Sequence, residues 1–103
     1  MRNAMLNITN LNKNNLFHFK TLNNTRLSFN NLNGDFLFVY KNSSFFDKIL
    51  LRKQIFLLKD SKEYYGYLWY SKKTSYYLIN SLNFKKEFMK AEYISNLLDC
   101  LKK

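Results

Sequence analysis

The second half of the chain carries three short runs of apolar and aromatic residues separated by polar turns. The runs cover residues 54–58, 64–70 and 75–84, and the turns cover 60–63 and 71–74. Runs of this length with such short connections are typical of neighbouring antiparallel strands. We therefore predict a three-stranded antiparallel meander.

A helix is predicted on each side of this meander. Ser44 and Asp47 have the spacing of a capping box, and Phe46, Ile49 and Leu50 then keep helical spacing. After the last strand, an apolar stripe with the same periodicity runs toward two terminal lysines, which a helix C-terminus favours. The residues of this stripe are Ala91, Ile94, Leu97, Leu98 and Leu101.

Alternation along the strands also predicts which side chains share a face of the sheet. In the middle strand, one face should carry Tyr65, Tyr67 and Trp69, and the other Tyr64, Leu68 and Tyr70. In the last strand, one face should carry Tyr76, Leu78, Leu82 and Phe84, and the other Tyr77 and Ile79.

Residues 1–43 are patterned more weakly. Leu16 and Phe19 favour a short helix over 14–22. Asn33-Gly34 lies between two apolar runs, which indicates a hairpin over 27–40, because both residues tolerate positive φ. A helix end with an extended run after it is the alternative for that segment.

Length and composition fit a single small domain with a real core. The 103 residues are 47% apolar and 18% aromatic. We predict an α+β fold with a helical or irregular N-terminal part, then a helix, the meander and a C-terminal helix. Residues 1–103 should form one domain, either excised from the N-terminal part of a longer chain or standing alone.

The net charge of +10 changes this picture less than its size suggests. Almost all of the excess positive charge comes from lysine. The chain is also rich in Asn, Ile, Phe and Tyr, and an A/T-rich coding sequence would produce this composition. Bidentate recognition of phosphate or guanine favours arginine over lysine. A nucleic-acid partner therefore stays an alternative and is not the first choice.

The chain offers little material for metal or nucleophilic chemistry. Cys100 and His18 are the only residues of their types, which excludes an internal disulfide and a cysteine-rich zinc site. We expect His18 to pack or lie at the surface, and Cys100 to be a buried structural thiol. Glu63, Glu87 and Glu92 fit solvated caps better than a general base, so we predict no metal and assign no catalytic residue.

No apolar run is long enough to span a bilayer, and the first ten residues lack the apolar region of a signal peptide. We therefore expect a cytoplasmic protein without a membrane partner.

Residues 44–103 combine the predicted order helix, three strands, helix with the run GYLWY at 66–70 and with a gapless spacing of the last strand, loop and helix. In these features they resemble the core of the GCN5-related N-acetyltransferases (GNAT). The family has an apolar strand end, four residues, an Arg/Gln-x-x-Gly-x-Gly/Ala loop and then a helix with paired leucines. Residues 1–43 would correspond to the family's first strand and opening helices.

Aligned without a gap, this motif falls on YYLINSLNF, the spacer 85–88, the loop 89–94 and the leucine pair Leu97-Leu98. The resemblance implies acetyl-CoA as the cofactor. The implied cofactor-binding residues are Leu82, Phe84, Met89, Lys90, Ala91, Glu92, Tyr93 and Ile94.

The loop departs from the family pattern at the positions that matter for phosphate binding. Met89 replaces Arg/Gln, and Glu92 and Ile94 replace the glycines that let the backbone approach the pyrophosphate. Lys85 and Lys86, with Lys90, could supply charge but not space. If active, the domain would be an acetyl-CoA-dependent N-acetyltransferase; the altered loop favours a non-catalytic domain with a structural or partner-binding role.

The sequence leaves two further functions open. The strand tyrosines with Lys59, Lys62, Lys72 and Lys73 could form a stacking platform for single-stranded nucleic acid. An open sheet edge with an aromatic face could instead pair with a second copy of the chain or a second GNAT-like domain.

Overall fold

The computed structural model describes residues 6–23, 27–28 and 36–102. In chain order its elements are β1 (Asn7–Asn10), α1 (Leu16–Asn23), β2 (Leu27–Ser28), α2 (Phe36–Lys41), α3 (Phe45–Arg52), β3 (Ile55–Lys59), β4 (Tyr64–Lys72), β5 (Tyr77–Phe84), the 3-10 turn η1 (Lys86–Phe88), α4 (Ala91–Asp99) and the 3-10 turn η2 (Cys100–Lys102). These helices and strands confirm the predicted α+β class.

The sheet is wider than the sequence pattern predicts. Its order is β1-β3-β4-β5-β2, and all neighbours are antiparallel. The meander β3-β4-β5 is confirmed at its centre, whereas β1 and β2 add an edge strand on each side. Hydrophobic periodicity missed β1 because Ile8 is the only apolar residue in its sequence, NITN.

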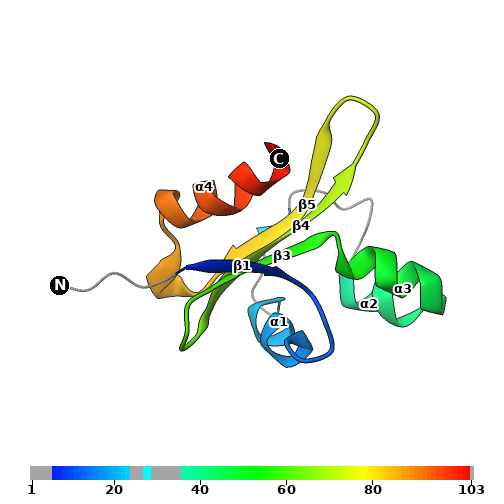
Figure 1. Ribbon diagram of the computed structural model, residues 1–103, viewed down its shortest axis with the longest axis horizontal. Coiled ribbons are helices and arrows are strands. Elements are labelled where there is room, and N and C mark those ends of the chain that lie inside the picture. Colours follow the sequence, from blue (N-terminus) through cyan, green and yellow to red (C-terminus); the bar gives the residue numbers. More distant parts are fainter. Residues whose placement is uncertain (1–5, 24–26, 29–35, 103) are drawn as a thin grey trace.

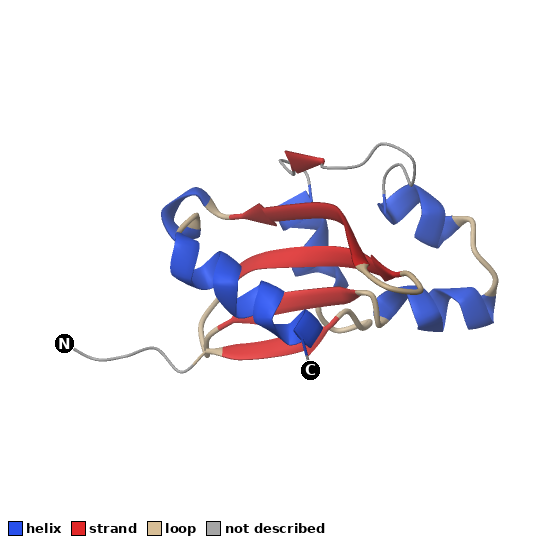
Figure 2. Ribbon diagram, turned by 90° about the horizontal axis from the view of Figure 1, so that it is seen from above, coloured by secondary structure: helices blue, strands red, loops and turns tan. Residues whose placement is uncertain are grey.

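The helices lie on both sides of this sheet. Figure 1 shows α4 on one side and α1 on the other, with α2 and α3 beside one end of the strands. The hairpin between β4 and β5 extends past the helices, and Figure 2 shows α4 crossing over the strands. None of the helices that the structure describes is long and apolar enough to cross a membrane.

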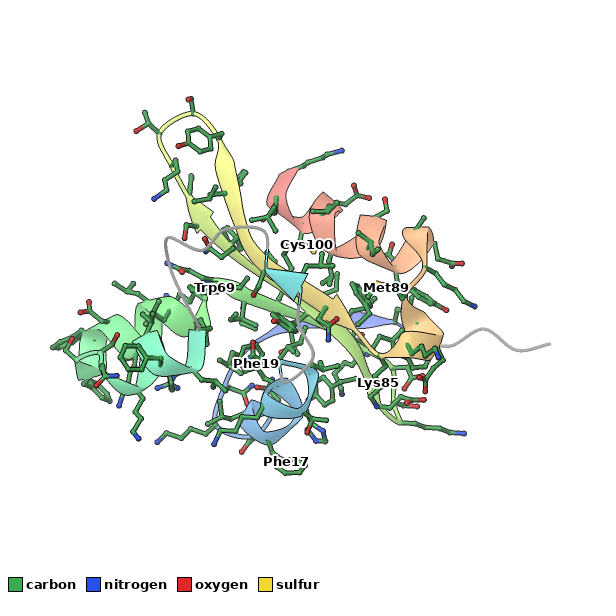
Figure 3. All side chains as sticks on the ribbon, turned by 180° about the vertical axis from the view of Figure 1, so that it is seen from behind. Phe17, Phe19, Trp69, Lys85, Met89 and Cys100 are labelled. Carbon is green, nitrogen blue, oxygen red and sulfur yellow. The ribbon has the colours of Figure 1, made fainter. Side chains whose placement is uncertain are left out.

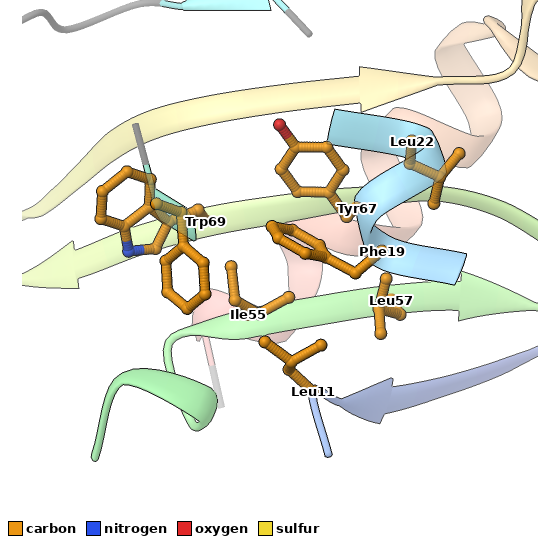
Figure 4. Close-up of a cluster of buried hydrophobic side chains, with 8 residues drawn as sticks. Leu11, Phe19, Leu22, Ile55, Leu57, Tyr67 and Trp69 are labelled. Atoms are coloured by element: carbon orange, nitrogen blue, oxygen red, sulfur yellow. The ribbon is translucent and has the colours of Figure 1, made fainter. Parts of the chain in front are cut away.

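One hydrophobic cluster lies between the sheet and helices α1 and α2 (Figure 4). The ring of Phe19 contacts the rings of Phe36 and Tyr67 edge to face, with centroids 5.3 and 4.9 Å away. Phe36 in turn contacts Trp69 at 5.1 Å. Edge-to-face contacts of buried rings add to the stability gained from apolar burial. The buried members of the cluster are Leu11, Phe19, Leu22, Phe36, Ile55, Leu57, Tyr67 and Trp69.

Buried hydrogen bonds attach the end of α1 to this face. The Tyr67 hydroxyl donates to Asn23 Oδ1 at 3.0 Å and lies 3.2 Å from Ser81 Oγ. Asn83 Nδ2 donates to the Leu22 carbonyl at 2.8 Å. This carbonyl lies in the last turn of α1, where carbonyl groups have no hydrogen-bond donor within the helix. These polar groups are buried with partners, so they fix α1 against β4 and β5 without a large desolvation penalty.

A second cluster lies on the opposite face, beneath α4. Leu97 is fully buried there, and Ile94 and Leu101 of the same apolar stripe pack against the cluster beside it. The buried members are Leu58, Tyr65, Leu68, Leu82, Phe84 and Leu97.

Two register shifts change which side chains share a face. In β4, Leu58 pairs with Gly66 but Lys59 pairs with Tyr64, so Tyr65 is an extra residue. In β5, Trp69 pairs with Ser81 and Tyr70 with Ile79, so Asn80 is extra. A β-bulge moves the residues beyond it to the other face. The predicted faces are therefore wrong for Tyr65, which joins the α4 cluster apart from Tyr67 and Trp69, and for Tyr64, which packs with Tyr67 and Trp69 apart from Leu68. They are also wrong for Ile79, which joins Leu82 and Phe84.

The second strand of the hairpin predicted over 27–40 is wrong. The extended run that the alternative prediction placed there is wrong as well. Residues Phe36–Lys41 form helix α2. Phe36 and Tyr40, four residues apart, stack at 5.6 Å on one helical face, and Phe36 fills the core between α1 and Trp69. The Asn33-Gly34 turn itself lies outside the described residues.

Both helices predicted around the meander are confirmed. At α3, Ser44 has extended dihedral angles and its side chain accepts a hydrogen bond from the Asp47 N–H at 3.2 Å. The helix predicted over 14–22 is also found, as α1.

Candidate functional site

The acyl-CoA segment implied by the family resemblance begins where β5 ends against β4. Phe84 pairs with Gly66, and its ring lies over the glycine so closely that a Cβ there would overlap the ring carbons. That Cβ would also lie 2.6 Å from the Asn83 carbonyl oxygen. Glycine is therefore required at position 66 to admit the Phe84 ring.

The backbone after Phe84 is tied to β4. The Lys85 N–H donates to the Tyr65 carbonyl at 2.8 Å, and Lys85 Nζ lies 3.2 Å from Glu63 Oε1. Lys85 is thus partly neutralised by a partner in the β3-β4 turn. Its charge is less available to a phosphate than the sequence alone suggests.

Tyr65 is the central side chain under the loop. Its ring stacks on Phe88, and its hydroxyl donates to Asp60 Oδ2 at 2.8 Å. Burial, together with the hydrogen bond and charge of Asp60, raises the pKa of Tyr65 to about 12. The phenol is therefore neutral at physiological pH, and its proton is held by a structural partner.

The N–H groups of the loop bond mainly to the loop itself. Phe88 donates to the Lys85 carbonyl, Met89 to Lys86 and Lys90 to Phe88, and the N–H groups of Tyr93 and Ile94 both donate to the Lys90 carbonyl. A pyrophosphate-binding loop must instead direct successive N–H groups at the ligand. Within 89–94, only Ala91 and Glu92 have an N–H without such a bond, since they lie in the first turn of α4.

Glu92 adds a charge that opposes an anion at this position. It lies in the first turn of α4, where a carboxylate interacts favourably with the positive helix terminus. Lys90, the residue before the helix, makes no side-chain capping hydrogen bond. A phosphate would have to compete with the Glu92 carboxylate for the same end of α4.

The eight implied cofactor-binding residues differ in how deeply they are buried. Leu82 and Phe84 are buried in the α4 cluster, and Tyr93 and Ile94 pack half-buried against it. Met89, Lys90, Ala91 and Glu92 are exposed. In Figure 3, Lys85 and Met89 lie at one end of α4 and Cys100 at the other. Half of the implied residues are therefore exposed, and the other half lie in the core or pack against it.

A cavity of about 440 Å³ lies against the other end of α4. It is lined by Leu6, Ile8, Leu58, Asn96, Asp99 and Cys100. Cys100 is half-buried, and its thiol lies 3.6 Å from the Asn96 carbonyl. Among the described residues, no group of three or more His, Cys, Asp and Glu side chains is placed to hold a metal ion.

The strand aromatics do not lie on one exposed platform. Tyr65, Tyr67 and Trp69 are buried, and Trp69 donates its indole N–H to Gln54 at 3.0 Å. Tyr64 is half-buried and stacks on His18 at 4.5 Å. The exposed aromatic and basic residues of β4 and β5 gather instead near the hairpin end, as Lys72, Lys73, Tyr76 and Tyr77.

Sequence reasoning missed a second cavity, of about 340 Å³, between α1, α2 and α3. Its lining residues are Leu16, Lys20, Leu37, Tyr40, Lys41 and Lys48. The three lysines come from three different helices, and the sequence pattern predicts no helix at α2, so residue spacing could not predict that they lie together. The sequence indicated only that Lys48 and Arg52, four residues apart on a predicted helix, share one helical face.

The chain matches no protein-family model, and neither a curated protein sequence nor a solved structure is significantly similar to it.

Proposed function

We propose that this chain is a GNAT-like domain whose acyl-CoA loop no longer binds the cofactor, and that its role is structural or partner-binding. The order of the elements supports the relationship. The edge strand β1 comes first, and helices α1, α2 and α3 come next, with the two-residue strand β2 between α1 and α2. The antiparallel strands β3, β4 and β5 then lead into the loop and α4, which lies on the side of the sheet opposite α1 (Figure 1). Apart from β2, this is the order that the resemblance implies for the family's first strand, opening helices and motif helix.

The non-catalytic part of the proposal depends on one observation. In the loop 89–94, all N–H groups except those of Ala91 and Glu92 donate to nearby carbonyls within residues 86–90, and Phe88 is stacked on Tyr65 beneath them. Binding acetyl-CoA there would require breaking these bonds and displacing Glu92 from the start of α4. Each lost hydrogen bond and each desolvated charge would reduce affinity.

A titration of the ¹⁵N-labelled protein with acetyl-CoA tests this proposal. We expect no saturable chemical-shift changes at residues 84–94 at millimolar cofactor. The matched variant is Met89→Arg with Glu92→Gly, which restores two positions of the motif and changes only exposed side chains. Saturable binding of the unaltered chain at micromolar acetyl-CoA, with transfer of acetyl to an amine, would contradict the proposal.

Exposed apolar side chains on α3 favour a second candidate role, association with another copy of the chain or with a second GNAT-like domain. Phe45, Phe46 and Leu50 are 68%, 76% and 58% exposed. Large apolar side chains grouped on one helix are typical of interaction surfaces. Sedimentation velocity over a range of concentrations tests self-association, and a monomer at all of them would remove that form of the proposal.

A further inference from the structure

The cavity between α1, α2 and α3 lies on the α1 side of the sheet, away from α4 and the loop. Each of the three helices contributes one lysine: Lys20 from α1, Lys41 from α2 and Lys48 from α3. Leu16, Leu37 and Tyr40 line the rest. The cavity is therefore an apolar hollow bordered by positive charge.

A fourth cation stands beside this cavity. Arg52 lies one turn of α3 after Lys48, and both approach the same ring: Lys48 Nζ lies 5.7 Å and Arg52 Cζ 6.0 Å from the centre of Tyr40. These distances are within the range of cation-π attraction. Contact with the Tyr40 ring thus keeps the positive charges of Lys48 and Arg52 close to the cavity.

Within the described part of the chain, no carboxylate forms an ion pair with these cations. The ion pairs found there join Lys85 to Glu63 and Lys102 to Asp99, and none involves Lys20, Lys41, Lys48 or Arg52. The nearest acid in sequence, Asp47, is exposed at the start of α3. Arg52 Nε is buried and has no hydrogen-bond partner. Cations that line one cavity favour an anion there, because it would relieve their repulsion.

The apolar side of the cavity is held in place by the core. Tyr40 stacks on Phe36 at 5.6 Å, with the ring planes 17° apart, and Phe36 is fully buried. Leu16 and Leu37 pack against the same cluster. This surface is preformed, and its volume of about 340 Å³ suits a small organic molecule.

We propose that this cavity binds a small organic phosphate. The three lysines would contact the phosphate, since lysine binds phosphate as a mobile point charge, and Arg52 would add positive potential from beside the cavity. The apolar part of the ligand would lie against Leu16, Leu37 and the Tyr40 ring. This site is independent of the loop on the other face of the sheet, so it does not depend on the GNAT relationship.

Phenyl phosphate is a suitable probe because it combines a dianion with an apolar ring. In ¹H-¹⁵N spectra at constant ionic strength, we expect saturable shifts at Leu16, Leu37, Tyr40 and Lys48, with a Kd of about 1 mM or tighter. Lys41→Gln with Lys48→Gln should weaken binding about thirtyfold, since each of the two lost charge-assisted contacts contributes about 1 kcal/mol and about 1.4 kcal/mol is tenfold. Lys72→Gln with Lys73→Gln on the hairpin removes equal charge elsewhere and should leave binding unchanged.

Two further probes distinguish a specific site from general attraction. Inorganic phosphate and phenol should each bind more weakly than phenyl phosphate, because each lacks one half of the recognition. The proposal is overturned if phenyl phosphate causes no saturable shifts at these residues, or if the hairpin variant loses as much affinity as the cavity variant. If inorganic phosphate binds as tightly as phenyl phosphate, the proposed contact of the ligand with the apolar residues is wrong.

Discussion

The ring of Tyr65 lies flat against the ring of Phe88, with centroids 3.7 Å apart and planes within 1° of parallel. Tyr65 is the extra residue of a β-bulge, and Phe88 is the last residue of η1. Tyr93 of α4 contacts both rings edge-on, at 5.0 and 6.0 Å. The bulge in β4 therefore supplies the surface on which the loop and the start of α4 rest.

Replacing Phe88 with alanine should loosen the loop and destabilise the fold. Because Phe88 is only half-buried, we expect a loss of about 2 kcal/mol, below the roughly 3–5 kcal/mol usual for a fully buried phenylalanine. Chemical denaturation measures this change. Phe17→Ala is the control, because Phe17 is 73% exposed and its loss should matter little. Equal effects of the two changes would contradict a supporting role for the stack.

The raised pKa of Tyr65 predicts how stability changes in alkaline solution. The folded-state pKa of about 12 lies above the ordinary value of 10.0, so the neutral phenol favours the folded state. This contribution is complete below pH 10 and is lost as pH rises toward 12. Tyr65→Phe should remove that part of the pH dependence. Denaturation curves of both proteins across this interval measure it, and Tyr76→Phe, at an exposed position, is the control.

Gly66→Ala should be strongly destabilising. The added Cβ would overlap the Phe84 ring and approach the Asn83 carbonyl, which is held in place by pairing between β4 and β5. We expect a loss of free energy of unfolding of about 3 kcal/mol, the upper end of the usual cost of overpacking, because this site cannot relax. Thermal unfolding measures this loss of stability. If the Phe84 ring is the main obstacle to the added Cβ, combining Gly66→Ala with Phe84→Leu should recover part of the lost stability. If no stability is recovered, the overlap of the Cβ with the Asn83 carbonyl is the cause.

Replacing Phe46 and Leu50 with serine should leave the fold intact. Both side chains are mostly exposed on α3, so their loss should change stability by about 0.5 kcal/mol or less each. If α3 forms an interface, the same variant should lower the sedimentation coefficient at high protein concentration. Unchanged association with unchanged stability would exclude these two residues from the interface.

The parts of the fold that the sequence predicted are those with strong local signals. The Ser44 cap, the three strands of the meander and the stripe of α4 each result from spacing within a few residues. The bulges at Tyr65 and Asn80 could not be predicted in this way, because alternation assumes an unbroken register. For α2, an Asn-Gly turn signal and a β-favouring FLFVY run outweighed the pairing of Phe36 with Tyr40 four residues on.

The same limit applies to the candidate sites. The altered residues of the loop were evident in the sequence, but the self-bonding of its N–H groups depends on the turn η1, which no spacing indicates. The lysine-bordered cavity depends on how three helices meet. Neighbours of that kind are set by tertiary packing and not by local pattern.

The edge strand β1 also sets the order in which the sheet can be completed during synthesis. Asn10 Nδ2 in the side chain donates to the Ile55 carbonyl, 45 positions further along the chain, and within the described sheet β1 pairs only with β3. At about 5–20 residues per second, the ribosome needs several seconds to make the segment between them. Until β3 has left the ribosome, β1 has no strand to join, so α1 can form before the strand that precedes it is paired.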